Sequence, residues 1–250
     1  MRLICEQSER EAGIKAAEII ASVIKEKPDA VLGLATGSTP IDIYRELIRM
    51  YRRGEISFEK VKTVNLDEYV SLSPTHEQSY AYFMRTNLFD KIDIKKENTH
   101  IPNGLASDLK EECRRYDRII ESLSGIDIQL LGIGHNGHIA FNEPSESFSK
   151  TTSLVELSNS TVKANSRFFD SEESVPTWAL SMGIGSILKA KKIILAAFGE
   201  SKAEILEKAL FGPVTPTVPA SILQFYQGEL TVVTDEAAFS VIKKSSYHKI

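Results

Sequence analysis

Residues 126–144 read IDIQLLGIGHNGHIAFNEP. The segment 126–131 is mostly apolar and has the length of a buried strand, whereas 132–144 combines glycines with histidines, amides and a carboxylate. Glycine tolerates positive φ and lets the backbone come close to a ligand. Loops at the carboxyl ends of parallel strands form the binding cleft of open α/β sheets. We therefore predict a strand over 126–131 and a functional loop over 132–144.

Strand-like and helix-like segments alternate on both sides of this stretch. This alternation predicts an α/β fold with an open, mostly parallel, Rossmann-like sheet and helices on both faces. Short strands are predicted at 3–5, 30–35, 61–66, 154–157, 193–198 and 230–233. Helices are predicted after Ser8 and over 41–51, 77–88, 108–123, 160–169, 177–188, 202–210 and 235–242.

No repeat, low-complexity tract or linker divides the chain. Residues 1–250 are therefore expected to form a single domain. The segment 145–175 is polar and weakly periodic, which favours a lid within that domain.

The composition argues against several kinds of partner. A net charge of −4 disfavours nucleic acid and anionic membranes. Cys5 and Cys113 are too few for a disulfide framework, and charged residues near the N-terminus leave no room for a signal peptide. We expect a soluble cytoplasmic protein that binds a small molecule, does not bind a membrane, and is compatible with a homo-oligomer.

The segment Thr36-Gly37-Ser38-Thr39-Pro40 joins a predicted strand to a predicted helix. Such a turn directs backbone N–H groups and hydroxyls to one point beside the positive end of the helix, which suits a phosphate. A plain capped turn is the alternative. Arg167 and Lys202 are candidate cations for the same phosphate, although each could equally be a solvated surface charge.

Two further positions carry acid–base chemistry. Asp67 closes the strand 61–66, where an apolar wall could raise its pKa and make it a general base; capping of the turn is the alternative. In the central loop, Glu143 and Asn136 could orient His138 as a proton shuttle. The alternative is that His138 serves only the structure of the loop.

Two other interpretations of the central loop are weaker. Gly132, Gly134 and Gly137 match a dinucleotide fingerprint, but Pro144 interrupts the long helix that should follow. His135 and His138 lack the i, i+4 spacing of a helical zinc pair, and no further His or Cys lies close by. We therefore expect neither a metal nor an organic cofactor.

Four blocks of the chain together resemble the glucosamine-6-phosphate deaminase family. They lie at 34–40 (LATGSTP), 65–69 (NLDEY), 132–144 and 164–169 (ANSRFF), in the family's order and across most of the chain. The resemblance implies an isomerase that is also a hydrolase of amino sugar phosphates, converting glucosamine 6-phosphate and water into fructose 6-phosphate and ammonia without metal or cofactor.

The resemblance also implies the role of each site residue. Asp67 would move the C2 proton to C1, and His138 with Glu143 would assist ring opening at O5. Thr36, Gly37, Ser38, Thr39, Arg167 and Lys202 would bind the substrate. Many family members have Asp at the position of Asn136, which can orient His138 but carries no charge.

Regulation and two alternative functions depend on the same blocks. Family members activated by N-acetylglucosamine 6-phosphate carry Arg and Lys just after the Asn-Glu-Pro stretch, whereas 152–155 has neither, so we expect no such activation. A 6-phosphogluconolactonase-like hydrolase shares the glycine loop, but that family's loop does not continue as 139–144 does. A non-catalytic sugar-phosphate sensor would need none of Asp67, His138 and Glu143.

Overall fold

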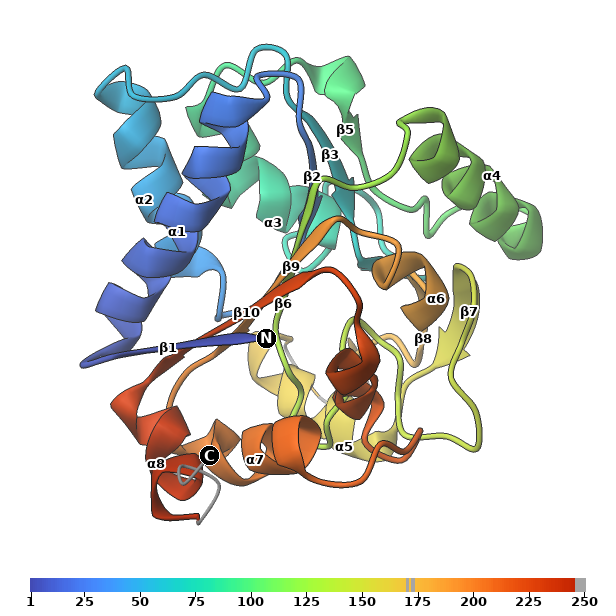
Figure 1. Ribbon diagram of the computed structural model, residues 1–250. Helices are drawn as coiled ribbons and strands as arrows, with labels where there is room; N and C mark the ends of the chain where they lie inside the picture. The colour runs from blue at the N-terminus through green and yellow to red at the C-terminus, as the bar shows by residue number, and fades with distance from the viewer. Residues whose placement is uncertain (170, 172–173, 246–250) are drawn as a thin grey trace.

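The computed structural model describes residues 1–169, 171 and 174–245. A seven-stranded sheet lies at its centre (Figure 1), in the order β1-β10-β9-β6-β2-β3-β5, and every neighbouring pair is parallel. The strands are β1 (Arg2–Glu6), β2 (Val31–Leu34), β3 (Lys62–Asn65), β5 (Thr99–His100), β6 (Ile128–Leu131), β9 (Lys192–Ala197) and β10 (Glu229–Asp235). The predicted α/β fold with a mostly parallel sheet is confirmed.

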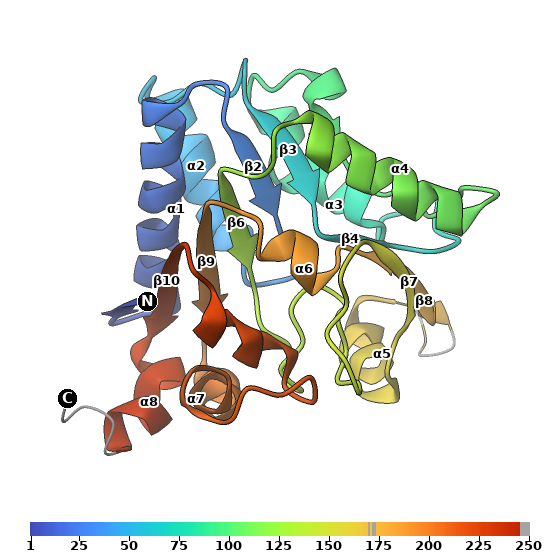
Figure 2. The ribbon, with the colours of Figure 1, turned by 45° about the vertical axis from the view of Figure 1, so that its right-hand side comes forward.

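Helices cover both faces of this sheet. In both views α1 (Glu9–Glu26) and α2 (Ile41–Arg52) pack side by side on one face, and α4 (Leu109–Ser122) and α6 (Ile184–Ile187) lie on the other (Figures 1 and 2). The remaining helices are α3 (Tyr80–Asn87), α5 (Asn159–Asn165), α7 (Ala203–Phe211) and α8 (Glu236–Lys244). Short 3₁₀ turns include η3 (Ser166–Phe168), η5 (Glu200–Lys202) and η6 (Pro219–Phe225).

Local sequence explains where these helices begin. Ser8 caps α1 as predicted, because its hydroxyl accepts the N–H of Glu11 at 3.3 Å. Ile20 and Ile24 then repeat at helical spacing and are buried against the sheet. The cap at Ser79 starts α3 at Tyr80, so the helix predicted over 77–88 is shorter at its beginning.

The chain order places the site at the centre of the sheet. β2 and β6 are neighbours, but β3 follows β2 on one side and β9 follows β6 on the other. This reversal is the topological switch point, where doubly wound sheets open a crevice at the carboxyl ends of their strands. The turn 36–40 and the loop 132–144 therefore meet there.

A second sheet was not predicted. It is antiparallel, in the order β4-β8-β7, with β4 (Asp67–Tyr69), β7 (Ser153–Glu156) and β8 (Trp178–Ser181). The helix predicted over 177–188 is wrong, because its first half is the strand β8 and only Ile184–Ile187 is helical. β4 follows β3 after Leu66, so Asp67 opens a new strand.

The helices of the described chain include none that is both long enough and apolar enough to cross a lipid bilayer.

Candidate active site

A cavity of about 530 Å³ lies at the switch point, a size ordinary for a small-molecule site. Three segments far apart in sequence supply most of its wall: the turn after β2, the loop after β6, and α5 with η3. The chemistry-bearing side chains on this wall are Thr36, Ser38, Thr39, Asp67, Tyr80, His135, Asn136, His138, Ser160, Thr161, Asn165, Arg167 and Lys202. The predicted site residues are thus brought to one place, with Glu143 behind the wall.

The turn after β2 forms one end of the cavity. Gly37 has φ +91°, a conformation that glycine adopts without steric cost. Pro40 is the N-cap of α2 and makes no side-chain capping bond. The first backbone N–H groups of a helix have no intrahelical acceptor, and the helix dipole favours an anion there. The backbone and the helix dipole at this end of the cavity favour negative charge.

Two cations line the same cavity. Arg167 comes from η3, and Lys202 from η5 after β9. Burial, and then the positive charge of Arg167, lower the pKa of Lys202 to about 8. A lysine held beside an arginine is stabilised when an anion binds, because the anion compensates both charges. The positions of the two cations therefore fit a shared phosphate.

Asp67 lines the cavity from the start of β4 and is 6% exposed. Burial, and then the negative charge of neighbouring Glu68, raise the pKa of its carboxyl group well above the ordinary value. Its side chain accepts no hydrogen bond from the described part of the chain. A carboxyl group with this environment is suited to hold a proton that it has taken from a bound molecule.

The central loop folds tightly around the His138 ring. A Cβ added at Gly134 would lie 2.3 Å from that ring, and Gly137 has φ +88°. These two positions require glycine, one for close approach and the other for its backbone conformation. The glycine pattern in 132–138 therefore places an imidazole on the cavity wall and does not open a dinucleotide-binding helix.

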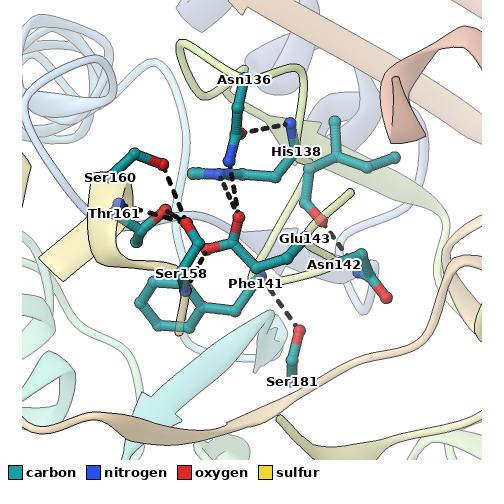
Figure 3. Close-up of polar contacts among 10 residues, drawn as sticks. Asn136, His138, Phe141, Asn142, Glu143, Ser158, Ser160, Thr161 and Ser181 are labelled. Atoms are coloured by element: carbon teal, nitrogen blue, oxygen red, sulfur yellow. Dashed lines mark hydrogen bonds and ion pairs between the residues drawn. The ribbon is translucent and has the colours of Figure 1, made fainter. Parts of the chain in front are cut away.

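Glu143 lies beside both Asn136 and His138 (Figure 3), but Asn136, which was predicted to orient the His138 ring, bonds to Glu143 and to the His138 backbone instead. Asn136 Nδ2 donates to Glu143 Oε2 at 2.6 Å, and Asn136 Oδ1 accepts the His138 backbone N–H at 3.2 Å. His138 Nδ1 lies 3.6 Å from the same carboxylate oxygen, which is longer than a hydrogen bond. Catalytic hydrogen bonds often tighten only when the substrate is bound.

The environment of Glu143 strongly favours its charged form. Burial alone raises the pKa, but His138, Thr161 and Asn136 outweigh it and lower the pKa of Glu143 to about 2. Ser158 adds a backbone N–H at 3.4 Å (Figure 3). Glu143 faces a neighbouring cavity of about 280 Å³, so it supports the active-site wall from behind.

Sequence reasoning missed part of the wall. Tyr80 and Phe141 line the cavity, with ring planes 15° apart and centroids 5.8 Å apart. Tyr69 joins them, with its centroid 4.9 Å from that of Tyr80, and accepts a hydrogen bond from Asn165 of α5 at 2.8 Å. No single stretch of sequence carries this cluster. Aromatic residues near each motif were the only signal.

The segment expected to be a lid contributes several of these wall residues. Ser160, Thr161, Asn165 and Arg167 belong to it and line the cavity. The predicted range 145–175 also includes Asp170, Glu172 and Glu173, which lie outside the described residues. Movement of this segment stays a prediction.

The fold is that of an α/β protein whose cavity lies at the carboxyl ends of the strands of a parallel sheet. The family model of glucosamine-6-phosphate isomerases/6-phosphogluconolactonase matches residues 6–232, and this chain belongs to that family.

Relatives and solved structures agree with this assignment. A glucosamine-6-phosphate deaminase of Lachnoclostridium phytofermentans is 57% identical over 93% of this chain and 98% of its own. A glucosamine-6-phosphate deaminase of Thermoanaerobacter pseudethanolicus is 53% identical over 100% of this chain and 98% of its own. A solved monomeric glucosamine-6-phosphate deaminase superposes with a TM-score of 0.94 at 48% identity, covering 96% of this chain and all of that one. A 6-phosphogluconolactonase from Trypanosoma brucei (TM-score 0.77, 17% identity, 96% and 97% covered) shares the fold.

Proposed function

We propose that this protein converts glucosamine 6-phosphate and water into fructose 6-phosphate and ammonia, as an isomerase coupled to deamination in amino sugar catabolism. One observation carries the proposal: Asp67 and His138 line the same cavity as the anion-binding turn and the two cations. Isomerisation of a sugar phosphate needs this combination of a base, a second proton carrier and a phosphate site. The names of relatives at 52–57% identity support the same reaction.

The phosphate fixes the substrate at one end of the cavity. The hydroxyls of Ser38 and Thr39 and the backbone of Gly37 would donate to phosphate oxygens, with Arg167 and Lys202 compensating the charge. An anion beside Lys202, whose pKa burial and Arg167 lower to about 8, favours the charged form of that lysine. Binding energy from the phosphate then orients the sugar carbons toward Asp67.

Asp67 is proposed to carry a proton between two carbons. In the open-chain sugar it removes the proton on C2, which gives an enol-type intermediate with a C1–C2 double bond. The substrate's ammonium group gives one proton to O1, and Asp67 returns its own proton to C1, so that C1 becomes an alcohol carbon and C2 an iminium carbon. Water then adds to C2 and ammonia leaves, which produces the ketone of fructose 6-phosphate. Burial raises the pKa of Asp67, which makes it a stronger base for the first step.

His138 is proposed to open the sugar ring by giving a proton to O5. Glu143 lies beside its ring, with Oε2 3.6 Å from Nδ1, and Asn136 accepts its backbone N–H, so the two side chains hold the imidazole in position. Asn136 is neutral, whereas the family resemblance implies Asp at this position in many members. In the group of Asn136, His138 and Glu143, the negative charge therefore comes from Glu143.

The alternatives predict different products. A 6-phosphogluconolactonase would hydrolyse its lactone and has no need of a base at C2. A sugar-phosphate sensor would bind ligand and release nothing. Similarity to the solved 6-phosphogluconolactonases, at 16–19% identity, shows the fold alone.

Ammonia and fructose 6-phosphate released from glucosamine 6-phosphate should be measured for the wild type, Asp67→Asn and Glu143→Gln. We expect equal amounts of both products from the wild type, and a loss of about 100-fold or more in each variant. Lactone hydrolysis without ammonia, or binding without turnover, would refute the proposal.

We also propose that the chain works as a single domain whose partner is the small amino sugar phosphate. A solved relative is named as monomeric, and a homo-oligomer of this chain stays a prediction that light scattering can test.

A further inference from the structure

A second buried carboxylate lies next to Asp67 in sequence and has no part in the proposed chemistry. Glu68 is 3% exposed and accepts three backbone N–H groups: from Tyr69 at 2.9 Å, from Tyr80 at 2.9 Å and from Ala81 at 2.8 Å. Neighbouring residues of a strand point to opposite sides. Asp67 therefore faces the cavity, while Glu68 faces the beginning of α3.

The beginning of α3 is where a buried anion costs least. Tyr80 and Ala81 are its first two residues, and their N–H groups have no acceptor within the helix. Both donate to Glu68, while the helix dipole adds a favourable field. Asp67 receives no comparable hydrogen bond from the described residues, so the three N–H donors favour the charged form of Glu68 and nothing equivalent does so at Asp67.

We infer that Glu68 is a positioning residue of this site: its carboxylate fixes the start of α3 against β4 and places a negative charge directly beside the proposed base. The inference rests on the proposed function. Two consequences follow for the cavity. The ring of Tyr80 is held on the wall through its own backbone N–H, and Asp67 binds its proton more tightly than it would beside a neutral residue.

The charges around the pair support this assignment. Burial raises the pKa of Glu68 to about 7, against the opposing effect of its three N–H donors. After burial, Glu68 is the next cause of the raised pKa of Asp67. Three tyrosines also interact electrostatically with Asp67: Tyr69 on β4, Tyr80 on α3 and Tyr116 on α4. Burial raises the pKa of each phenol, so all three stay neutral.

Besides Tyr80, the titratable or charged groups that line the cavity with Asp67 are His135, His138, Arg167 and Lys202. Glu68 is thus the one negative side chain of the described residues that raises the pKa of Asp67. Since two adjacent negative charges repel, removing the charge of Glu68 makes Asp67 a weaker base.

The test is the pH dependence of kcat/KM for ammonia release by the wild type and Glu68→Gln. We expect the acidic limb of Glu68→Gln to move to lower pH and its plateau rate to fall. Glu112→Gln is a matched control, because Glu112 is also buried and accepts a backbone N–H, from Asn103 at 2.7 Å, but does not line the cavity. Its acidic limb should match that of the wild type, even if the protein is less stable.

An acidic limb at the wild-type position in Glu68→Gln would overturn the inference. If that variant does not fold, Glu68→Asp decides, since it keeps the charge on a shorter side chain. Its acidic limb should remain near the wild-type position while kcat falls, and a limb moved to lower pH would overturn the inference. A wild-type protein that releases no ammonia would instead refute the proposed function, which separates the two failures.

Discussion

Glu143→Gln tests whether the charge of this carboxylate stabilises the folded site. The substitution keeps the shape of the side chain and an oxygen that can accept the Asn136 N–H at the present 2.6 Å. It removes only the negative charge beside His138, 3.6 Å away. Any change therefore reports electrostatics more than packing.

The expected magnitude follows from the pKa of Glu143. His138, Thr161 and Asn136 lower it from the ordinary 4.5 to about 2 against the effect of burial. At about 1.4 kcal/mol per pKa unit, this shift corresponds to about 3 kcal/mol of stability. The side chain is 12% exposed and lies on a cavity wall, so solvent screening reduces the expected loss to about 2 kcal/mol.

The sign of the pH dependence is fixed by the direction of the shift. A carboxyl group with a lowered folded-state pKa stabilises the protein above its unfolded-state pKa, and this stability is lost as the pH falls. The contribution of Glu143 should thus be complete at pH 7 and decline from about pH 4.5 toward pH 2. Urea unfolding of wild type and Glu143→Gln at pH 7, 5, 4 and 3 measures the difference.

Glu156→Gln is the matched control. Glu156 is exposed and faces the same neighbouring cavity as Glu143. Its substitution should change the free energy of unfolding by less than about 0.5 kcal/mol at every pH. The reasoning is wrong if Glu143→Gln matches the wild type at pH 7, or if its deficit is the same at pH 3 as at pH 7.

Three other predictions follow from the site. Asp67→Asn should unfold at a higher temperature than the wild type, and the difference should be larger at pH 8 than at pH 4. The pKa of Asp67 is raised in the folded state, so its charged form destabilises the fold as the pH rises. Calorimetry at both pH values measures the difference. Gly134→Ala should lower kcat about 100-fold, since the new Cβ must displace the His138 ring. In the same assay Gly132→Ala should keep most of the rate, because the atom nearest to its new Cβ would be 3.9 Å away. N-acetylglucosamine 6-phosphate should leave the substrate saturation curve unchanged and hyperbolic, because residues 152–155 carry neither the Arg nor the Lys expected of family members that it activates; initial rates with and without it test this.

Much of the central architecture could be predicted because its signals are local. The apolar run before the glycine loop and the cap at Ser8 each act within a few residues. The turn 36–40 lies between a buried strand and a helix whose apolar face is periodic. Elements that are specified by neighbouring residues form in the structure as predicted, so the positions of the site segments followed from the sequence.

The second sheet could not be predicted for the opposite reason. Its strands are three or four residues long, and β8 pairs with both β4 and β7, which end more than 20 residues before it in the chain. Residues 178–181 have the same apolar character as a buried helix segment. Only pairing with distant strands decides between the two structures, and the sequence pattern carries no record of that pairing.

The same limit applies to Glu68 and reveals how the site is built. In sequence, Asp67 and Glu68 are equivalent neighbours, and either could serve as a base. The fold distinguishes them by hydrogen bonds: three N–H groups hold Glu68, whereas Asp67 faces the cavity with none from the described chain. Burial disfavours the charged forms of Asp67 and Lys202, and the charges of Glu68 and Arg167 add to this effect. A substrate that carries an amine and a phosphate supplies the opposite charge to each, so the binding energy is directed to the groups that react.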